Sequence, residues 1–168
     1  GASSEVPIPV EVSRKFIGGV GLGAWILFRE SKKGMNCLAP EAPLIFCFSP
    51  LVGTPLTTSA KFAVLAKSPL TNRISDALSS SHFAIEAKKT GFDAIVITGK
   101  SATKRIVIIE EGKVTLQNAD DLQGLSALAT SEKLHTRLAA GFQIAAIGLA
   151  GENQVLFANL SHERRHAG

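Results

Sequence analysis

The residues Leu44-Ile45-Phe46-Cys47-Phe48 form an uninterrupted apolar run that ends at Ser49-Pro50. A short continuous apolar run is typical of a β-strand covered on both faces, because a half-exposed strand alternates apolar and polar side chains. The run therefore predicts a strand inside a sheet. Cys47 is interpreted as a packed core residue, since free cysteines are often buried.

The segment before this strand predicts a buried helix that begins near Gly19. It opens with Gly18-Gly19-Val20-Gly21-Leu22-Gly23 and continues as an apolar stretch. The spacing is G-x-G-x-G rather than G-x-G-x-x-G and no Val/Ile-rich strand precedes it, so a dinucleotide-binding loop is not supported. The glycines are interpreted as residues that let the helix pack closely, or as bare backbone against which a cofactor could lie.

Further strands and helices are interspersed along the chain. Strands are predicted at residues 62–66, 94–98, 105–109, 114–116, 144–147 and 154–158. Helices are predicted at residues 82–89, with an N-cap from Ser79-Ser80-Ser81, and at residues 126–140, with an apolar stripe of Leu128, Leu134 and Leu138. Since this order lacks a strict βαβ alternation, the expected fold class is α+β in a single domain.

The composition excludes several classes of protein. The chain has 168 residues, of which 45% are hydrophobic and 19% charged, which suits one packed domain and excludes general disorder. Its apolar runs are all shorter than the ~18 residues of a membrane span. Two cysteines are too few for a zinc or iron–sulfur site of their own. The net charge of +4 comes from scattered Lys and Arg, and only 6% of residues are aromatic, so nucleic acid is not expected as a partner.

The ends of the chain carry expectations of their own. Residues 1–13 are interpreted as a leader, with Gly1 as a remnant of tag removal, and a short N-terminal segment. The domain is expected to occupy residues 14–168 and to be truncated at its end. No signal sequence is recognisable, so the expected location is the cytoplasm, without membrane association.

Three groups of side chains are candidates for chemistry. His162 and His166 have the spacing of a two-histidine metal site, but no H-E-x-x-H is present, so they are interpreted as a solvated basic segment. The serines at 79–81 have no triad-like neighbours and are interpreted as helix caps. Several basic residues adjoin loops rich in Ser, Thr, Gly and Pro, where free backbone N–H groups favour a phosphate-bearing ligand. These are Lys61, Lys67, Arg73, Arg164 and Arg165.

Three blocks of sequence are informative when taken together. The first is Gly18-Gly19-Val20-Gly21-Leu22-Gly23-Ala24 followed by Ile26-Leu27. The second is Ser49-Pro50-Leu51-Val52-Gly53-Thr54, then Ala66-Lys67-Ser68-Pro69-Leu70-Thr71, then Lys88-Lys89-Thr90-Gly91-Phe92-Asp93-Ala94-Ile95-Val96-Ile97-Thr98-Gly99-Lys100. The third is Ile147-Gly148-Leu149-Ala150-Gly151-Glu152-Asn153, then Phe157-Ala158, then Arg165-His166-Ala167-Gly168. In order and spacing, from about residue 14 onward, they resemble the N-terminal domain of the aldehyde:ferredoxin oxidoreductase (tungstopterin oxidoreductase) family.

The resemblance implies an α+β domain of two similar sheet-containing halves. Gly91-Phe92 and Gly141-Phe142, each before a predicted strand, are a weak sign of such a repeat. In the family this domain is the base on which a tungsten, occasionally molybdenum, bis-pyranopterin lies. Family members oxidise aldehydes to carboxylic acids, and a [4Fe–4S] cluster passes the electrons to ferredoxin. The cluster cysteines and most of the substrate pocket belong to helical domains that would follow Gly168, so no catalytic residue is expected here and the chain alone is expected to be inactive.

The resemblance also assigns the candidate cofactor-binding residues. Lys61 stands where Arg is usual between pterin and cluster, and Leu78-Ser79-Ser80-Ser81 stands where the family has Asn-Ser-Gly-Gly. The main-chain carbonyls of Leu78 and His166 would hold the Mg²⁺ that links the pterin phosphates. Arg165 keeps the phosphate-facing arginine of the family.

An alternative remains open at this point. The chain could be a cofactor-free relative that serves as a structural or subunit-interaction domain. Lys61 and Arg165 favour the cofactor-binding domain, whereas Leu78, the two serines Ser80-Ser81 and Val20, which replaces a usual Arg, favour the alternative. Because the cofactor and the helical domains would cover part of this domain in the longer protein, an apolar face is expected near residues 18–23 and 79–81, through which the chain could form a homo-oligomer.

Overall fold

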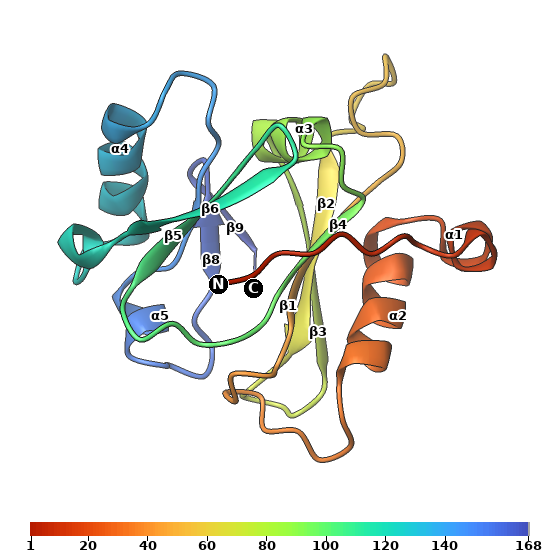
Figure 1. Ribbon diagram of the computed structural model, residues 1–168, viewed down its shortest axis with the longest axis horizontal. Coiled ribbons are helices and arrows are strands. Elements are labelled where there is room, and N and C mark those ends of the chain that lie inside the picture. Colours follow the sequence, from red (N-terminus) through yellow and green to blue (C-terminus); the bar gives the residue numbers. More distant parts are fainter. Residues whose placement is uncertain (168) are drawn as a thin grey trace.

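The structure is a computed structural model that describes residues 1–167 and shows an α+β fold, as expected (Figure 1). Gly168, the last residue of the third sequence block, lies outside the described residues. The elements of the first half are α1 (Val10–Phe16), α2 (Gly19–Glu30), β1 (Leu44–Phe48), β2 (Lys61–Lys67), β3 (Ile74–Ser80), α3 (His82–Lys89) and β4 (Ala94–Ile97). Those of the second half are β5 (Arg105–Glu110), β6 (Lys113–Asn118), the 3₁₀ turn η1 (Asp120–Leu122), α4 (Ala127–Arg137), β7 (Ala145–Ala146), α5 (Leu149–Glu152), β8 (Leu160–His162) and β9 (Arg165–Ala167).

Strand β1 lies inside an antiparallel sheet of order β3-β2-β1-β4. Ile45 and Cys47 face α2 on one side of the sheet, while Phe46 and Phe48 belong to the core on the other side. Both faces of β1 are therefore covered, which confirms the prediction from its continuous apolar run. Cys47 is fully buried, and this burial raises the pKa of its thiol to about 12.

Two of the three glycines of α2, Gly21 and Gly23, are packing residues, as the sequence suggested, whereas a Cβ at Gly19 would meet nothing within 4 Å. Gly23 lies against the Leu65 side chain of β2, where an added Cβ would overlap the Leu65 methyl groups. A Cβ at Gly21 would lie 2.8 Å from the carbonyl oxygen of Phe16. The helix thus approaches β2 and the end of α1 more closely than any larger residue would allow.

The second half contains the hairpin β5-β6, a small sheet of order β7-β8-β9 and helix α4. In both halves a helix leads through a Gly-Phe pair to an edge strand: α3, Gly91-Phe92 and β4 in the first, and α4, Gly141-Phe142 and β7 in the second. The small sheet packs on the same face of the large sheet as α3, because Ala167, Ala145 and Leu160 join the phenylalanine core of β1 and β2. As a result, the β8–β9 hairpin lies next to β3.

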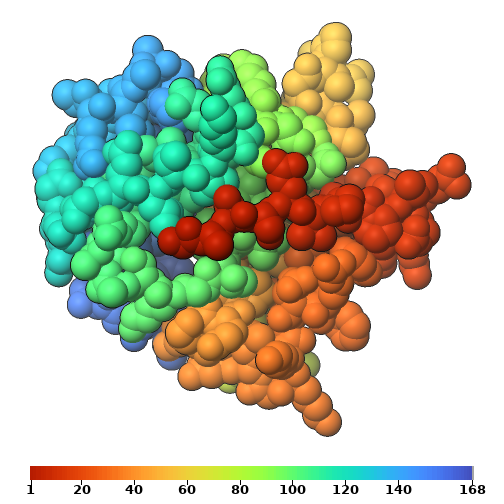
Figure 2. Space-filling view, viewed as in Figure 1, coloured from red at the N-terminus to blue at the C-terminus, as the bar shows by residue number. Residues whose placement is uncertain are grey.

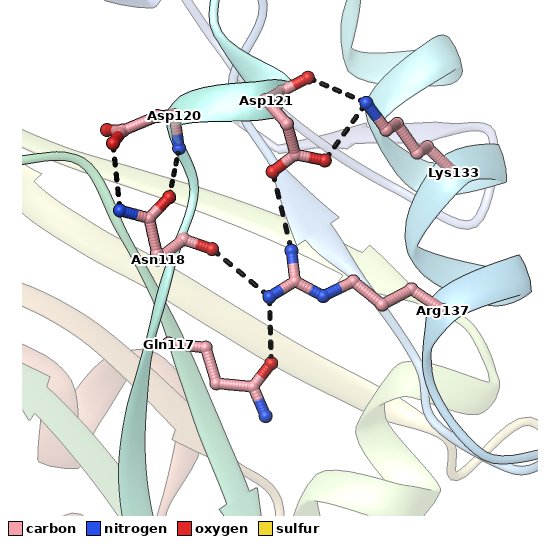
Figure 3. Close-up of polar contacts among 6 residues, drawn as sticks. All are labelled: Gln117, Asn118, Asp120, Asp121, Lys133 and Arg137. Atoms are coloured by element: carbon pink, nitrogen blue, oxygen red, sulfur yellow. Dashed lines mark hydrogen bonds and ion pairs between the residues drawn. The ribbon is translucent and has the colours of Figure 1, made fainter.

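Helix α4 is fixed by polar contacts at its exposed side (Figure 3). Lys133 Nζ lies 2.9 Å from Asp121 Oδ2 and donates to the Asp121 carbonyl oxygen. Arg137 donates to Gln117 Oε1 and to the Asn118 carbonyl, at 3.1 and 3.2 Å. The hydrogen bond from Lys133 is the main reason that the pKa of Asp121 lies below its usual value. The predicted apolar stripe is wrong at Leu128, which is 49% exposed, while Thr130 is buried in its place.

Two further segments differ from what the sequence predicts. Residues 154–158 form no strand: α5 and a turn precede them, Gln154 has a positive φ of 55°, and Phe157 is 77% exposed. Strand β3 was not predicted, because its Ser- and Asp-containing sequence lacks the apolar alternation of a typical strand. Helix α1 spans residues 13 and 14, where the domain is expected to begin, and this boundary stays a prediction.

The segment before α1 lies across the surface toward the second half (Figure 2), and a Cβ at Gly1 would lie 3.0 Å from Leu116 of β6. None of the helices in residues 1–167 is both long and apolar enough to cross a membrane.

Candidate functional site

The residues assigned by resemblance meet where β2 begins and β3 ends. Lys61 pairs with Ser80, Phe62 with Ser79 and Ala63 with Leu78. Directly opposed residues on antiparallel strands point to the same face of the sheet, and successive residues point to opposite faces. Lys61, Ser80 and Leu78 therefore share the face of α2, and Ser79 shares the phenylalanine face with Phe62.

His162 of β8 occupies the space below Ser79 and Ser81. Its side chain is only 2% exposed, its Nε2 lies 2.6 Å from Ser79 Oγ, and its Nδ1 lies 3.0 Å from Ser81 Oγ. The imidazole also packs edge-on against the Phe62 ring at 4.9 Å between centroids. The interpretation of this histidine as part of a solvated segment is therefore wrong, because the small sheet is packed on the large one and encloses it.

Ser81 has a second role that the sequence did predict. Its Oγ accepts a hydrogen bond from the Phe83 N–H at 3.1 Å and caps α3. Ser79 and Ser81 thus direct their hydroxyls into the protein, toward His162 and the helix end. Among the three serines, only Ser80 has its hydroxyl on the outer face.

Arg165 of β9 reaches Ser80 from the neighbouring hairpin. Its Nη1 donates to Ser80 Oγ at 3.4 Å, and its side chain is exposed. His166 follows on β9, where its Nδ1 lies 3.0 Å from Ser161 Oγ and its ring is exposed, in agreement with the predicted solvated segment. The structure therefore places two cationic residues, Lys61 and Arg165, beside the Ser80 hydroxyl.

The other basic candidates lie elsewhere. Lys67 at the far end of β2 donates to the Met35 carbonyl at 2.6 Å and holds the connector before β1. Arg73 precedes β3, at the end of this strand opposite to Ser80. Arg164 lies in the exposed two-residue turn between β8 and β9.

The electrostatics of the site favour an anion. Within residues 1–167, neither Lys61 nor Arg165 forms an ion pair with a carboxylate. Burial, and then the positive charge of Arg165, lower the pKa of His162 below its usual value of 6.5, against the opposing effect of Glu163. His162 is consequently neutral at pH 7, and the positive charge lies with Lys61 and Arg165.

These residues fit the phosphate end of a pterin cofactor. Ser80 has Lys61 as its partner in the strand register and Arg165 Nη1 3.4 Å from its hydroxyl, and Leu78, which is 68% exposed, adds an apolar surface two residues along the same face. The Cβ atoms of Ser79 and Ser81 point into the protein, so they do not fill the outer face. No group of three or more His, Cys, Asp or Glu side chains in the described chain could hold a metal ion.

A cavity of about 870 Å³ lies away from this site, between the two halves. Its apolar lining includes Phe46 and Ile95 of the large sheet and Ile108, Leu134 and Ile144 of the second half. None of the seven residues assigned by resemblance lines it: Lys61, Leu78, Ser79, Ser80, Ser81, Arg165 and His166. The cavity is therefore distinct from the candidate site.

Comparisons with known proteins place this arrangement in a family. The family model "Aldehyde ferredoxin oxidoreductase, N-terminal domain" matches residues 1–168. The tungsten-containing aldehyde ferredoxin oxidoreductase of Pyrococcus furiosus is 33% identical over 158 residues, which are 94% of this chain and 26% of that protein. The corresponding protein of Pyrococcus abyssi is 34% identical over 168 residues, covering 99% of this chain and 28% of its own length.

Two other relatives carry different names. The WOR-like subunit of an aliphatic sulfonate oxidoreductase of Pyrococcus furiosus is 28% identical over 179 residues, with 97% of this chain and 28% of that protein covered. A solved structure of the active site complex BamBC of benzoyl coenzyme A reductase matches with a TM-score of 0.94 and 32% identity, over 99% of this chain and 26% of that one. This chain thus spans about a quarter of the length of these relatives. It belongs to the aldehyde ferredoxin oxidoreductase family and corresponds to its N-terminal domain.

Proposed function

We propose that this domain binds a tungsten or molybdenum bis-pyranopterin through the cofactor's phosphates, at the edge formed by Lys61, Ser80 and Arg165. The observation that carries the proposal is the pair of cations beside the Ser80 hydroxyl, with Arg165 Nη1 3.4 Å from Ser80 Oγ and Lys61 opposite Ser80 in the sheet. The tungsten-containing relatives support the kind of cofactor.

Each residue has a separate task in this proposal. The Arg165 guanidinium can donate two parallel hydrogen bonds to one phosphate, while Lys61 supplies a point charge without such a fork. The Ser80 hydroxyl donates a further hydrogen bond. The main-chain carbonyls of Leu78 and His166 would hold a Mg²⁺ ion, a role that does not depend on their side chains.

The reaction is proposed for a longer protein that contains this domain. The chemistry supplied by the bound cofactor would be oxidation of an aldehyde to a carboxylic acid, with electrons passing through a [4Fe–4S] cluster to ferredoxin. The two cysteines of this chain are not suited to ligate that cluster, since Cys47 is enclosed in the sheet and Cys37 contacts Ser68 and Asn72. We therefore propose that the cluster ligands and most of the substrate pocket come from other segments and that this domain alone is inactive.

Metal analysis tests the cofactor. The domain is expressed within a longer protein in a host that makes the pterin and is supplied with tungstate, beside a known homologue as positive control. We expect stoichiometric tungsten or molybdenum with pterin, and a large loss in the variant Lys61→Ala/Arg165→Ala. The matched control is Lys113→Ala, which removes an exposed cation of β6 and should leave the metal content unchanged. Absence of metal and pterin, under conditions that load the homologue, would overturn the proposal.

The cavity between the halves favours a second candidate. An apolar space of about 870 Å³, beside the fully exposed strand β6, suits a domain that packs against another protein segment. In that case the domain would be a cofactor-free structural or subunit-interaction module. The same experiment separates the two, because such a module retains neither metal nor pterin and is indifferent to loss of Lys61 and Arg165.

A further inference from the structure

We propose that His162 is a positioning residue of the anion site, which fixes the end of β3 through Ser79 and Ser81 so that Ser80 is presented to Arg165. The inference rests on the proposed function, since it concerns how the same site is held in shape. It goes beyond the residues that the family resemblance assigns, because His162 is not among them.

The alternation of β3 separates two roles among three consecutive serines. Ser79 and Ser81 point to the phenylalanine face, where each hydroxyl is within 3.0 Å of one His162 ring nitrogen. Ser80 points to the other face, beside Lys61 and Arg165. The residues that hold the strand are therefore interleaved with the residue that faces a ligand.

An imidazole is well suited to this bridge. Alternate side chains of a strand are about 6.5 Å apart along the chain, and the two nitrogens of one rigid ring, on either side of Cε1, direct their hydrogen bonds in diverging directions. Each nitrogen can pair with a hydroxyl, which can donate or accept as the tautomer requires. The ring itself packs against both Phe62 and Phe83, at centroid distances of 4.9 and 6.0 Å, and these two phenylalanine rings also contact each other. The bridge thus ties β3 to a part of the structure that is already rigid.

The same histidine connects the two parts of the structure that contribute residues to the anion site. Ser80 comes from the large sheet, whereas Arg165 comes from the β8–β9 hairpin, in which His162 pairs directly with Arg165. Because His162 bonds to β3 and belongs to the hairpin, it sets the position of Arg165 relative to Ser80. Loss of the bridge should allow the hairpin and the strand end to move apart while the phenylalanine core stays packed.

Inorganic pyrophosphate is the probe for the test. Its affinity for the full chain is measured by titration calorimetry at fixed low salt, for the wild type, His162→Phe, Arg165→Ala and the double variant. His162→Phe keeps an aromatic ring against Phe62 and Phe83 and removes both hydrogen bonds. We expect it to weaken binding about tenfold, the scale of one hydrogen bond to an anion. In the Arg165→Ala background the same change should have little further effect, since the residue it positions is gone.

Additional variants guard against a simple loss of folding. Ser79→Ala and Ser81→Ala each remove one of the two bonds and should each weaken binding about threefold. His162→Gln keeps a hydrogen-bonding group and should restore part of the affinity. His82→Gln, at the exposed first residue of α3, is the control and should bind as the wild type does.

The outcomes are distinct. Wild-type affinity in His162→Phe, or an equal loss in the presence and absence of Arg165, overturns the positioning role while leaving the anion site intact. Unchanged binding in Arg165→Ala, or no binding by the wild type, overturns the proposed anion site itself and with it this role of His162.

Discussion

At the scale of single residues, the environment of His162 could not be predicted from the sequence. Its partners Ser79 and Ser81 are 83 and 81 residues away along the chain, so no local pattern connects them. The serines and Arg165 are candidates because the family resemblance assigns roles to their positions, and their cofactor-binding roles stay predictions. The role of Ser81 as a helix cap was also predictable, because capping depends only on adjacent residues. The burial of His162, in contrast, results from the packing of the small sheet on the large one, which no local sequence pattern reveals.

The lowered pKa of His162 predicts how stability changes with pH. The folded state holds this imidazole neutral below the pH at which the unfolded chain binds a proton, near 6.5. In that window the unfolded state therefore carries more protons, and the free energy of unfolding should fall as the pH drops below about 6.5. The measurement is urea unfolding at a series of pH values between 7.5 and 5.

The variant His162→Phe is the comparison for this prediction. It lacks the titrating group, so its free energy of unfolding should depend less on pH over the same interval. An equally steep pH dependence in both proteins would show that His162 does not contribute.

At the scale of elements, the sequence predicts a helix or strand correctly when neighbouring residues alone determine its structure. Strand β1 is predictable because a run of five apolar residues, with Pro43 before it and Ser49-Pro50 after it, is too short for a buried helix and suits a buried strand. Strand β3 is not, because ISDALSS at residues 74–80 has only weak strand preference and is a strand through its pairing with β2. Residues 154–158 show the opposite case, in which a local apolar run is exposed in a turn after α5.

The β8–β9 turn should be open to stabilisation. Glu163 and Arg164 form a two-residue hairpin loop with φ values of 45° and 62°, a left-handed pair that favours Asn and Gly. Glu163 is not a suitable position for substitution, because its Oε1 accepts a hydrogen bond from the Ile144 N–H at 2.9 Å. Replacing Arg164 by Gly should raise the free energy of unfolding by about 0.5–1 kcal/mol, as the strain of a left-handed residue is relieved.

Arg164→Ala serves as the matched control, since it removes the same side chain but keeps the Cβ. It should not give the increase seen with glycine in chemical or thermal unfolding. If both variants are equally stabilised, the effect comes from the lost arginine charge and not from the backbone.

At the scale of the whole molecule, the apolar face expected near residues 18–23 and 79–81 is present only in part. Leu22 and Gly23 are buried under the sheet, so the glycine segment contributes to the core and not to a free surface. The face lies instead beside β3, where Leu78 is 68% and Ile74 53% exposed, and continues to Phe28 of α2 at 86%. Ile74 and Phe28 line one shallow pocket of about 240 Å³.

This face predicts self-association of the isolated chain. Exposed apolar patches of this kind mark surfaces that associate with other proteins. We expect the molar mass measured by light scattering to rise with concentration, and Phe28→Ser/Leu78→Ser to suppress the rise. Val114→Ser, on the exposed strand β6, is the control for a general decrease in hydrophobicity. A constant monomer mass over the whole range would contradict the prediction.

The two thiols give the molecule a built-in reporter of its own unfolding. Cys47 is enclosed between β2 and β4 with its pKa raised to about 12, so it is scarcely ionised at neutral pH and alkylating reagents cannot reach it. Cys37 is partly exposed in the connector before β1. An alkylating reagent therefore adds one label to each folded molecule and two to each unfolded one. Intact-mass spectrometry can then count both populations in a mixture, at protein concentrations too low for optical methods and without introducing any mutation.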